Sequence, residues 1–342
     1  MRKDRRFRMP TPVASLSIAA RATLDMHSLN NEGGEGNQIQ TRMVDIVGGD
    51  GRLHNVNAIS GDMLKHIQTQ HFFELARAGE LPLCAGCQQF NTNRINADRE
   101  WTAQAPKADR EALDQLLMRC ALDDVAGILI TAGNRSLPRK SVVEFGWVVG
   151  VPQLTRSGSY FHVKYANERG KETRDADAAS RDSEGSNLGQ AIFHRPASSG
   201  VYAIVCHLEL ERIGYNDITQ TYAINEAERA RRATALLRSV AHTFLELNGA
   251  MRATQLPHLV ALEGVMSWSQ SGAIPAPMVS PLAGGQDDPD LYLRQVLDIT
   301  SSLNGSGQPA VTARPFASVS EFAQQMRALT DDATPARAAV AR

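Results

Sequence analysis

The feature that most constrains the fold is a long alternating stretch near the start of the chain, Val13–Asp25. Hydrophobic residues recur at every second position from Leu16 to Leu24, and polar residues such as Ser17 and Arg21 occupy positions between them. Because side chains alternate between the two faces of a strand, this pattern predicts a half-buried strand with one polar face. One buried and one solvated face is typical of an antiparallel sheet.

Strands and helices are mixed along the rest of the chain. Thr41–Val47 and Arg52–Ile59 predict a hairpin around a Gly-Gly-Asp-Gly turn. The two types of element do not alternate regularly, so an α+β fold is favoured over a doubly wound sheet. Helices are predicted after Ser60 and over Asp109–Leu122, Asn225–Leu247, Pro289–Leu303 and Ser318–Ala328, and further strands over Val125–Thr131, Val142–Val149, Val201–Leu210 and His258–Val265.

The composition excludes several classes of protein. No apolar run approaches the roughly 18 residues of a membrane span, and no apolar segment follows the basic N-terminus as a secretory signal requires. Four cysteines in 342 residues indicate a reducing cytoplasm rather than a disulfide framework. The net charge of −1 argues mildly against a nucleic-acid binder, but basic residues gather locally, in residues 2–8 and at Arg135, Arg139 and Lys140.

The start of the helix after Ser60 is a candidate phosphate site. Ser60 and Gly61 lie where a strand leads directly into a helix, whose free backbone N–H groups attract anions. Lys65 and His66 follow within the first two turns and add charge and hydrogen-bond donors. An ordinary capped helix is the alternative interpretation.

Two cysteines have the spacing of half a zinc site. Cys84 and Cys87 are separated by two residues, but no second pair follows at a suitable distance. Cys120 and Cys206 fall on apolar faces and are assigned to the core. The alternative interpretation is that Cys84 and Cys87 are two free thiols. Histidines that can complete such a site are His54 and His71.

No catalytic motif of a zinc protease, a nucleophile elbow or a Walker nucleotide site is present. Asp25 and Asp45 are candidates to face one another across strands and hold a metal, although nothing in the pattern distinguishes them from other acidic residues. We therefore expect a protein that is not an enzyme and has no cofactor.

Six stretches, taken in order, resemble the DevR-type CRISPR-associated autoregulator family. The first three are SLSIAARATLDMHSLNNEGGEGNQIQTRMVDIV, NVNAISGDMLKHI and LCAGCQQFNTNRI, and the later three are RKSVVEFGWVVG, FHRPASSGVYAIV and GAMRATQLPHLVALEGV. The resemblance extends from Val13 to Trp268. It implies the backbone subunit of a type I CRISPR surveillance (Cascade) complex.

The resemblance also implies an architecture, an RRM/ferredoxin-like palm with an antiparallel sheet, a helical insertion and a protruding thumb-like loop. In this chain the palm is expected over residues 13–280, with the helical insertion at 80–135 and the thumb at 156–199. The remaining expected parts are a basic disordered arm at 1–12, a C-terminal helical segment at 281–330 and a disordered tail at 331–342.

The implied function is antiviral defence or guided DNA targeting. Many copies stack head to tail along the CRISPR guide RNA, with other Cascade subunits, and present the guide for pairing with target DNA. Residues carried over from the family as RNA-binding are Arg21, Ser60, Gly61, Lys65, His66, Arg135, Arg139, Lys140, Phe193, Arg195, Arg252, Gln255 and His258.

Two other functions stay open at this point. Related backbone subunits of type III complexes cut target RNA with an acidic residue and a metal ion, and Asp25 or Asp45 is the candidate here. A stand-alone regulator that binds DNA or RNA is the second alternative.

Overall fold

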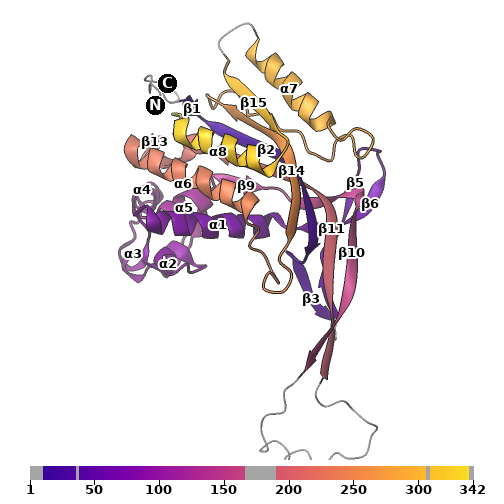
Figure 1. Cartoon of the computed structure of the whole chain (residues 1–342). Helices are drawn as coiled ribbons and strands as arrows, with labels where there is room; N and C mark the ends of the chain where they lie inside the picture. The colour runs from indigo at the N-terminus through magenta and orange to yellow at the C-terminus, as the bar shows by residue number, and fades with distance from the viewer. Residues whose placement is uncertain (1–10, 36–37, 166–189, 306–308, 339–342) are drawn as a thin grey trace, which may run out of the picture.

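The computed structural model describes residues 11–35, 38–165, 190–305 and 309–338. A ten-stranded, mainly antiparallel sheet forms the centre of the molecule, with helices packed against it (Figure 1). The α+β class expected from the sequence is therefore confirmed. None of the described helices is both long and apolar enough to cross a membrane.

The main sheet has the strand order β15-β14-β2-β11-β10-β6-β5, with β9 and β4 also pairing with β11 and β3 pairing with β4. Three small two-stranded sheets, β1-β16, β7-β8 and β12-β13, lie outside it. The strands of the main sheet are β2 (Ser15–His27), β3 (Asn31–Glu35), β4 (Gln38–Thr41), β5 (Met43–Val47), β6 (Leu53–Ile59), β9 (Val143–Phe145), β10 (Val148–Tyr165), β11 (Gln190–Glu209), β14 (His258–Ser269) and β15 (Val311–Phe316). Those of the small sheets are β1 (Thr11–Val13), β16 (Ala333–Pro335), β7 (Ile128–Ile130), β8 (Leu137–Arg139), β12 (Tyr215–Asn216) and β13 (Thr221–Tyr222).

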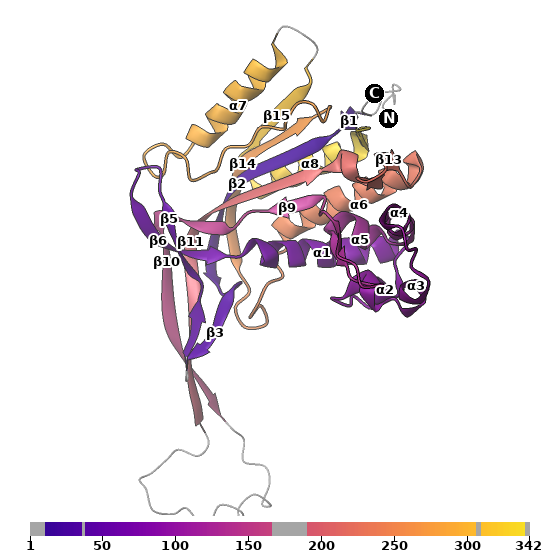
Figure 2. The ribbon, with the colours of Figure 1, turned by 180° about the vertical axis from the view of Figure 1, so that it is seen from behind.

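The central strand β2 confirms the alternating pattern but not the open face. Leu16 and Leu24 face the main core, as predicted. The polar face is covered as well, because α7 (Leu291–Asn304) packs there and places Tyr292 against Ala19. In both views α7 lies on the side of the sheet away from α1, α6 and α8 (Figures 1 and 2). The predicted solvated face is therefore wrong over much of β2.

The other face of the sheet is covered by three longer helices, α1 (Gly61–Ala78), α6 (Glu226–Leu245) and α8 (Val319–Asp332). Each begins after a polar cap, in turn Ser60, Asn225 and Ser318, whose side chain accepts a backbone N–H of the first turn. These caps are why the predicted helix starts are confirmed within a residue or two.

Short helices fill the region between α1 and β7. The predicted single helix over Asp109–Leu122 is divided, because Cys120 takes an extended conformation between α4 and α5. The predicted strand Val125–Thr131 shrinks to β7, since α5 continues to Ala126. The elements of this region are α2 (Ala85–Gln88), η1 (Arg94–Ala97), α3 (Arg99–Gln104), α4 (Asp109–Arg119) and α5 (Ala121–Ala126).

A long two-stranded ribbon forms the two described arms of the loop predicted over residues 156–199, that is 156–165 and 190–199. Strands β10 and β11 pair without interruption from Thr155 opposite Gly200 to Tyr165 opposite Gln190. The ribbon projects from the body of the molecule in both views (Figures 1 and 2). Residues 166–189, the expected thumb tip, lie outside the described residues.

The two ends of the described chain lie side by side. Strand β16 pairs in parallel with β1, and the backbone N–H of Ala336 donates to the carbonyl of Val13 at 2.9 Å. The expected disordered tail over 331–342 is therefore wrong for its first part. Residues 1–10 of the expected arm and 339–342 of the tail lie outside the described residues.

Candidate nucleic-acid interface

The mouth of α1 is fixed by contacts within the protein. The Ser60 hydroxyl accepts the N–H of Met63 at 3.2 Å, and the Ser60 N–H donates to Oδ1 of Asn30 at 2.9 Å. A methyl group on Gly61 would lie 2.5 Å from the carbonyl oxygen of Phe145, so only glycine fits there. Ser60 and Gly61 therefore set the position of the helix.

Lys65 lies between two hollows on the surface beside this mouth. One, of about 310 Å³, is also lined by His66, Phe90 and Arg94. The other, of about 290 Å³, is lined by Gly61, Glu144 and Trp147 among others. We call the surface around these hollows the α1 groove; it includes Lys65, His66, Phe90, Arg94 and Trp147.

Two cations meet in the α1 groove. Partial burial, and then repulsion from the nearby Arg94 guanidinium, lower the pKa of Lys65. In the described part of the chain no ion pair is formed by either residue, and Arg94 donates only to the carbonyl of Gly127, at 2.9 Å. The carboxylates of Asp62 and Glu144, which also line these hollows, offset part of the repulsion without forming an ion pair with Lys65 in the described chain, so the two cations are available to an anion.

Sequence reasoning missed Arg94 and Trp147. Arg94 has a left-handed φ of +50° at the start of η1, so no helical or strand periodicity marks it. Trp147 lies in the gap between β9 and β10, where its side chain is 48% exposed beside the guanidinium of Arg42. The exposed ring of Trp147 indicates a binding surface only because the fold brings it next to Arg42 and Lys65, which are distant in the sequence.

The basic cluster predicted at residues 135–140 does not form one surface. Arg139 is fully buried and donates to Asp124 at 2.7 Å and to the carbonyl of Arg212 at 2.6 Å. Lys140 is exposed but pairs with Glu209 at 3.0 Å and Glu144 at 3.2 Å. These partners correct the expectation of phosphate contacts for Arg139, because its guanidinium has no path to solvent.

Arg135 and Arg21 are also used inside the protein. Arg135 donates to the carbonyl of Pro106 and pairs with Asp109 at 3.5 Å. Arg21 is 3% exposed and donates to the carbonyl of Pro281 at 2.7 Å, beneath the segment that leads into α7. The predicted position of Arg21 on a guide-facing surface is therefore wrong, since this segment covers it.

A second group of predicted residues gathers at the base of the ribbon. Arg195 donates to the hydroxyl of Thr254 at 2.9 Å, and the amide of Gln255 donates to the carbonyl of Pro196 at 2.8 Å. Strand β11 and the segment before β14 are thus joined by side chains. The exposed His258 begins β14, Arg252 pairs with Glu246 at 2.6 Å, and Phe193 lies in β11 opposite His162.

The segment from His27 to Asn30 connects the two groups. Asn30 accepts from Ser60 at the mouth of α1, and Leu29 accepts the N–H of Ala250, in the segment before β14, at 3.2 Å. Burial lowers the pKa of His27 to about 4, because the apolar surroundings disfavour its charged form. The α1 groove and the ribbon base are thus held together by a buried junction.

The two acidic candidates for a metal do not meet. Asp25 ends the part of β2 that pairs with His258, and Asp45 of β5 accepts from Asn55 at 2.7 Å. Strands β11, β10 and β6 separate β2 from β5 in the sheet. The expectation that these carboxylates face one another is therefore wrong.

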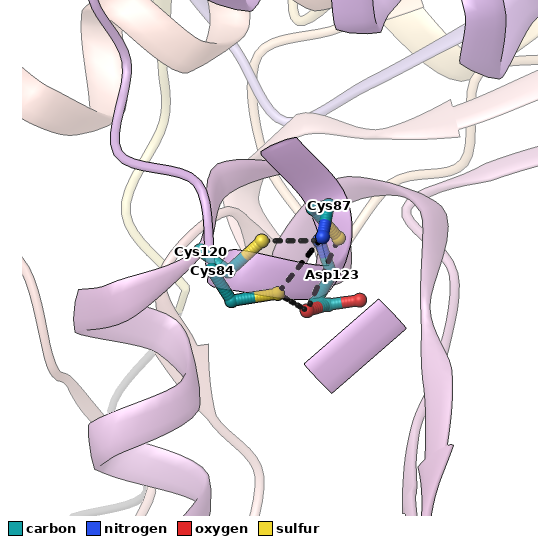
Figure 3. A group of neighbouring side chains, drawn as sticks. All are labelled: Cys84, Cys87, Cys120 and Asp123. Carbon is teal, nitrogen blue, oxygen red and sulfur yellow. Dashed lines mark hydrogen bonds between the residues drawn. The ribbon is translucent and has the colours of Figure 1, made fainter. Parts of the chain in front are cut away.

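The cysteine pair has different neighbours from those expected. Cys84 and Cys87 lie beside Cys120 and Asp123 in a buried cluster (Figure 3). His54 is bonded instead to Asp50, and His71 to the carbonyl of Glu246. Cys120 is buried, as predicted, but as a member of this cluster.

Comparison with known families places the chain among CRISPR-associated proteins. Residues 18–286 match the family described as CRISPR-associated negative auto-regulator DevR/Csa2. The match covers more than half of the chain, so the protein belongs to the DevR/Csa2 family. The resemblance seen in the sequence is confirmed.

Individual relatives are distant. A CRISPR-associated protein Cas7/Cst2/DevR from Methanocaldococcus jannaschii is 25% identical over 273 residues, which cover 76% of this chain and 82% of the relative. A chain of a CRISPR RNA-guided surveillance complex in a pre-nicking state has a TM-score of 0.49 at 12% identity, over 93% of this chain and 99% of that one. Csc2 of Thermofilum pendens has a TM-score of 0.39 at 14% identity, over 94% and 86% of the two chains.

Proposed function

We propose that this protein is the guide-RNA-binding backbone subunit of a type I CRISPR surveillance complex and has no catalytic step of its own. Membership of the DevR/Csa2 family supports the assignment to such a complex. The observation that carries the RNA-binding role is the unpaired cation couple Lys65 and Arg94 in the α1 groove.

The α1 groove suits a sugar-phosphate backbone rather than a particular sequence. Lys65 and Arg94 supply point charges for phosphates, and the exposed ring of Trp147 offers a stacking surface. Contacts to phosphate and sugar fix the position of a strand without reading its bases. Base pairing with target DNA then reads the sequence.

The central sheet and the ribbon correspond, in this proposal, to an RRM-like palm and a thumb. Tyr160 and Phe161, which lie on β10 opposite Arg195 and His194, are 48% and 59% exposed, so that their rings can stack on or separate bases. The ribbon of one copy reaches the guide bound to the next, and a head-to-tail contact that does not close on itself generates a filament. Other Cascade subunits and target DNA are the remaining proposed partners.

The test is RNA binding by the double variant Lys65→Ala/Arg94→Ala. We expect affinity for single-stranded RNA to fall about tenfold or more, and the slope of log affinity against log salt to become shallower by about 1.4, because each lost phosphate contact removes about 0.7. Fluorescence anisotropy with a labelled RNA at several salt concentrations measures both quantities. The control is Arg327→Ala on α8, an 85% exposed arginine on another element.

An unchanged affinity and salt slope in the double variant would exclude the α1 groove as the RNA site. A second measurement separates the guide-binding role from that of a stand-alone regulator. RNA of uniform length that co-purifies with the complex is expected for a guide-binding subunit, whereas a regulator would bring down no such RNA.

A further inference from the structure

Four potential metal ligands from separate segments meet in the interior. The thiols of Cys84, Cys87 and Cys120 and a carboxylate oxygen of Asp123 all lie within 4.8 Å of one another (Figure 3). All four residues are at most 1% exposed. Within the described residues this is the one such group of histidine, cysteine or acidic side chains.

The cluster consists of two pairs of residues, Cys84 with Cys87 and Cys120 with Asp123, that have the same local geometry. Cys84 caps α2 and its sulfur accepts the N–H of Cys87, three residues on, at 3.4 Å. Cys120 caps α5 and its sulfur accepts the N–H of Asp123, again three residues on, at 3.4 Å. Each half thus presents two ligands on one short turn, with a backbone N–H directed at the first sulfur, which favours a thiolate there.

The spacing fits a tetrahedral ion. With metal–sulfur bonds of about 2.3 Å and a metal–oxygen bond of about 2.0 Å, the ligand atoms of a tetrahedral zinc site lie about 3.8 Å apart between sulfurs and about 3.5 Å between sulfur and oxygen. The Asp123 oxygen lies 3.3 Å from the sulfur of Cys84 and 3.6 Å from that of Cys87. These two distances match the sulfur–oxygen edge of such a tetrahedron, and every other pair of ligand atoms lies within 4.8 Å.

The contrast between two adjacent carboxylates argues for a missing positive charge. Asp124 and Asp123 are both fully buried. Asp124 is neutralised by Arg139 and Arg232. Asp123 has thiols around one oxygen, and its Oδ1 has no partner among the described residues. The Arg94 guanidinium is the nearby positive charge that acts on Asp123, but it forms no ion pair with it in the described chain. Burying a carboxylate without an ion pair is costly, and cysteines that only fill a core do not need a carboxylate beside them.

We propose that Cys84, Cys87, Cys120 and Asp123 bind one structural Zn²⁺. Three sulfurs and one oxygen complete a tetrahedron, and a closed site with four protein ligands is structural rather than catalytic. On binding, the three thiols lose their protons to solvent and the carboxylate binds as the anion.

The ion joins α2 to α5 and thereby fixes the segment that follows α2. Gly86 in α2 accepts the N–H of Asn91, and a methyl group on Gly86 would lie 2.0 Å from the carbonyl oxygen of Arg94. The backbone of Arg94 is thus packed directly on α2, the helix that carries Cys87. The metal therefore holds one wall of the α1 groove, although the site itself stands on the four ligands and not on the proposed function.

The first test is metal content. We expect full-length protein purified under reducing conditions in the presence of zinc to contain about one Zn²⁺ per chain. Inductively coupled plasma mass spectrometry measures this content. Cys120→Ser is expected to lower that content more than about tenfold after dialysis against a mild chelator. Cys206→Ser is the matched control, because Cys206 is also buried but lies in β11 away from the cluster.

The second test does not depend on removing a ligand. Chelator-treated wild-type protein given Co²⁺ should show the visible absorption of tetrahedral cobalt and the sulfur-to-cobalt charge-transfer band. Asp123→Cys should keep the ion and strengthen that band by about one third, because a fourth thiolate joins three. A merely structural Asp123 would give no such change.

Several outcomes overturn the site. These are no zinc and no cobalt spectrum in the wild type, equal metal loss in Cys120→Ser and Cys206→Ser, or a Cys84–Cys87 disulfide in the reduced preparation. Metal content is read without RNA, so failure of the α1 groove as an RNA site leaves this result unaffected.

Discussion

Replacing Asp124 with alanine is expected to lower the free energy of unfolding by about 3–5 kcal/mol. The Asp124 carboxylate accepts from Arg139 at 2.7 Å, from Arg232 at 2.8 Å and from the backbone N–H of Gly214 at 3.0 Å. Neither arginine side chain nor Asp124 itself has any exposed surface. Without the carboxylate, the two buried guanidinium groups keep only the more exposed carboxylates of Glu228, at 2.9 Å from Arg232, and Asp217, at 3.3 Å from Arg139.

Denaturant unfolding followed by circular dichroism measures this loss. The matched control is Asp217→Ala, because Asp217 also pairs with Arg139, at 3.3 Å, but is 42% exposed. Its removal is expected to cost less than about 1 kcal/mol. Equal effects of the two substitutions would show that the buried ion pairs of Asp124 do not stabilise the fold more than the exposed pair of Asp217 does.

Burial by distant segments explains why sequence reasoning placed Arg139 and Arg21 on the surface. Arg139 and Arg21 stand in basic or polar contexts, which indicate a surface when only neighbours in the sequence are visible. Their partners come from distant segments, Arg212 and Tyr215 for Arg139 and Pro281 for Arg21. The sequence therefore shows where the arginines are, but it does not show which of them the fold buries.

Elements that depend on residues close together in the sequence are predicted more accurately. The hairpin of β5 and β6, and the helix after Ser60, follow from a glycine-rich turn and a capping hydroxyl, and both are confirmed. The family resemblance implies a thumb-like loop over residues 156–199, and the described parts of this segment are instead paired strands. Its strands are held by backbone pairing across the ribbon, which polarity does not reveal.

In the candidate sites, too, some residues can be predicted from their neighbours in the sequence and others are brought in only by the fold. Lys65 was predicted from its place in the first turns of a helix, and it lines the α1 groove. Arg94 joins it only because α2 and α5 bring η1 against the helix. Likewise the Cys84–Cys87 pair was visible from its spacing. Cys120 and Asp123 were hidden because the turn between α4 and α5 interrupts what the periodicity presented as one helix.

Acidification is expected to destabilise the protein through His27, by about 3 kcal/mol between pH 6.5 and pH 4. Burial lowers the folded-state pKa of His27 to about 4, whereas the unfolded chain takes up the proton near pH 6.5. The unfolded state therefore binds more protons in this window, so stability is full above pH 6.5 and falls as the pH decreases towards 4.

The structural reason lies in the junction between the α1 groove and the ribbon base. The His27 ring packs edge-on against Tyr202 at 4.9 Å, and its Nε2 has no partner within the described chain. A proton on this ring would place an unpaired charge in the core. The segment that carries Asn30, and with it the mouth of α1, would then lose its support.

The measurement is the free energy of unfolding of wild type and His27→Gln at several pH values from 7 to 4. His207 and His242 also have pKa values lowered by burial and add a dependence of the same sign, so the difference between the two proteins isolates His27. His54→Gln, which alters a histidine at a surface turn, is the control. We expect the variant to start less stable at pH 7 and to lose less on acidification than wild type. Parallel curves for wild type and His27→Gln would mean that His27 does not stay neutral in the folded protein.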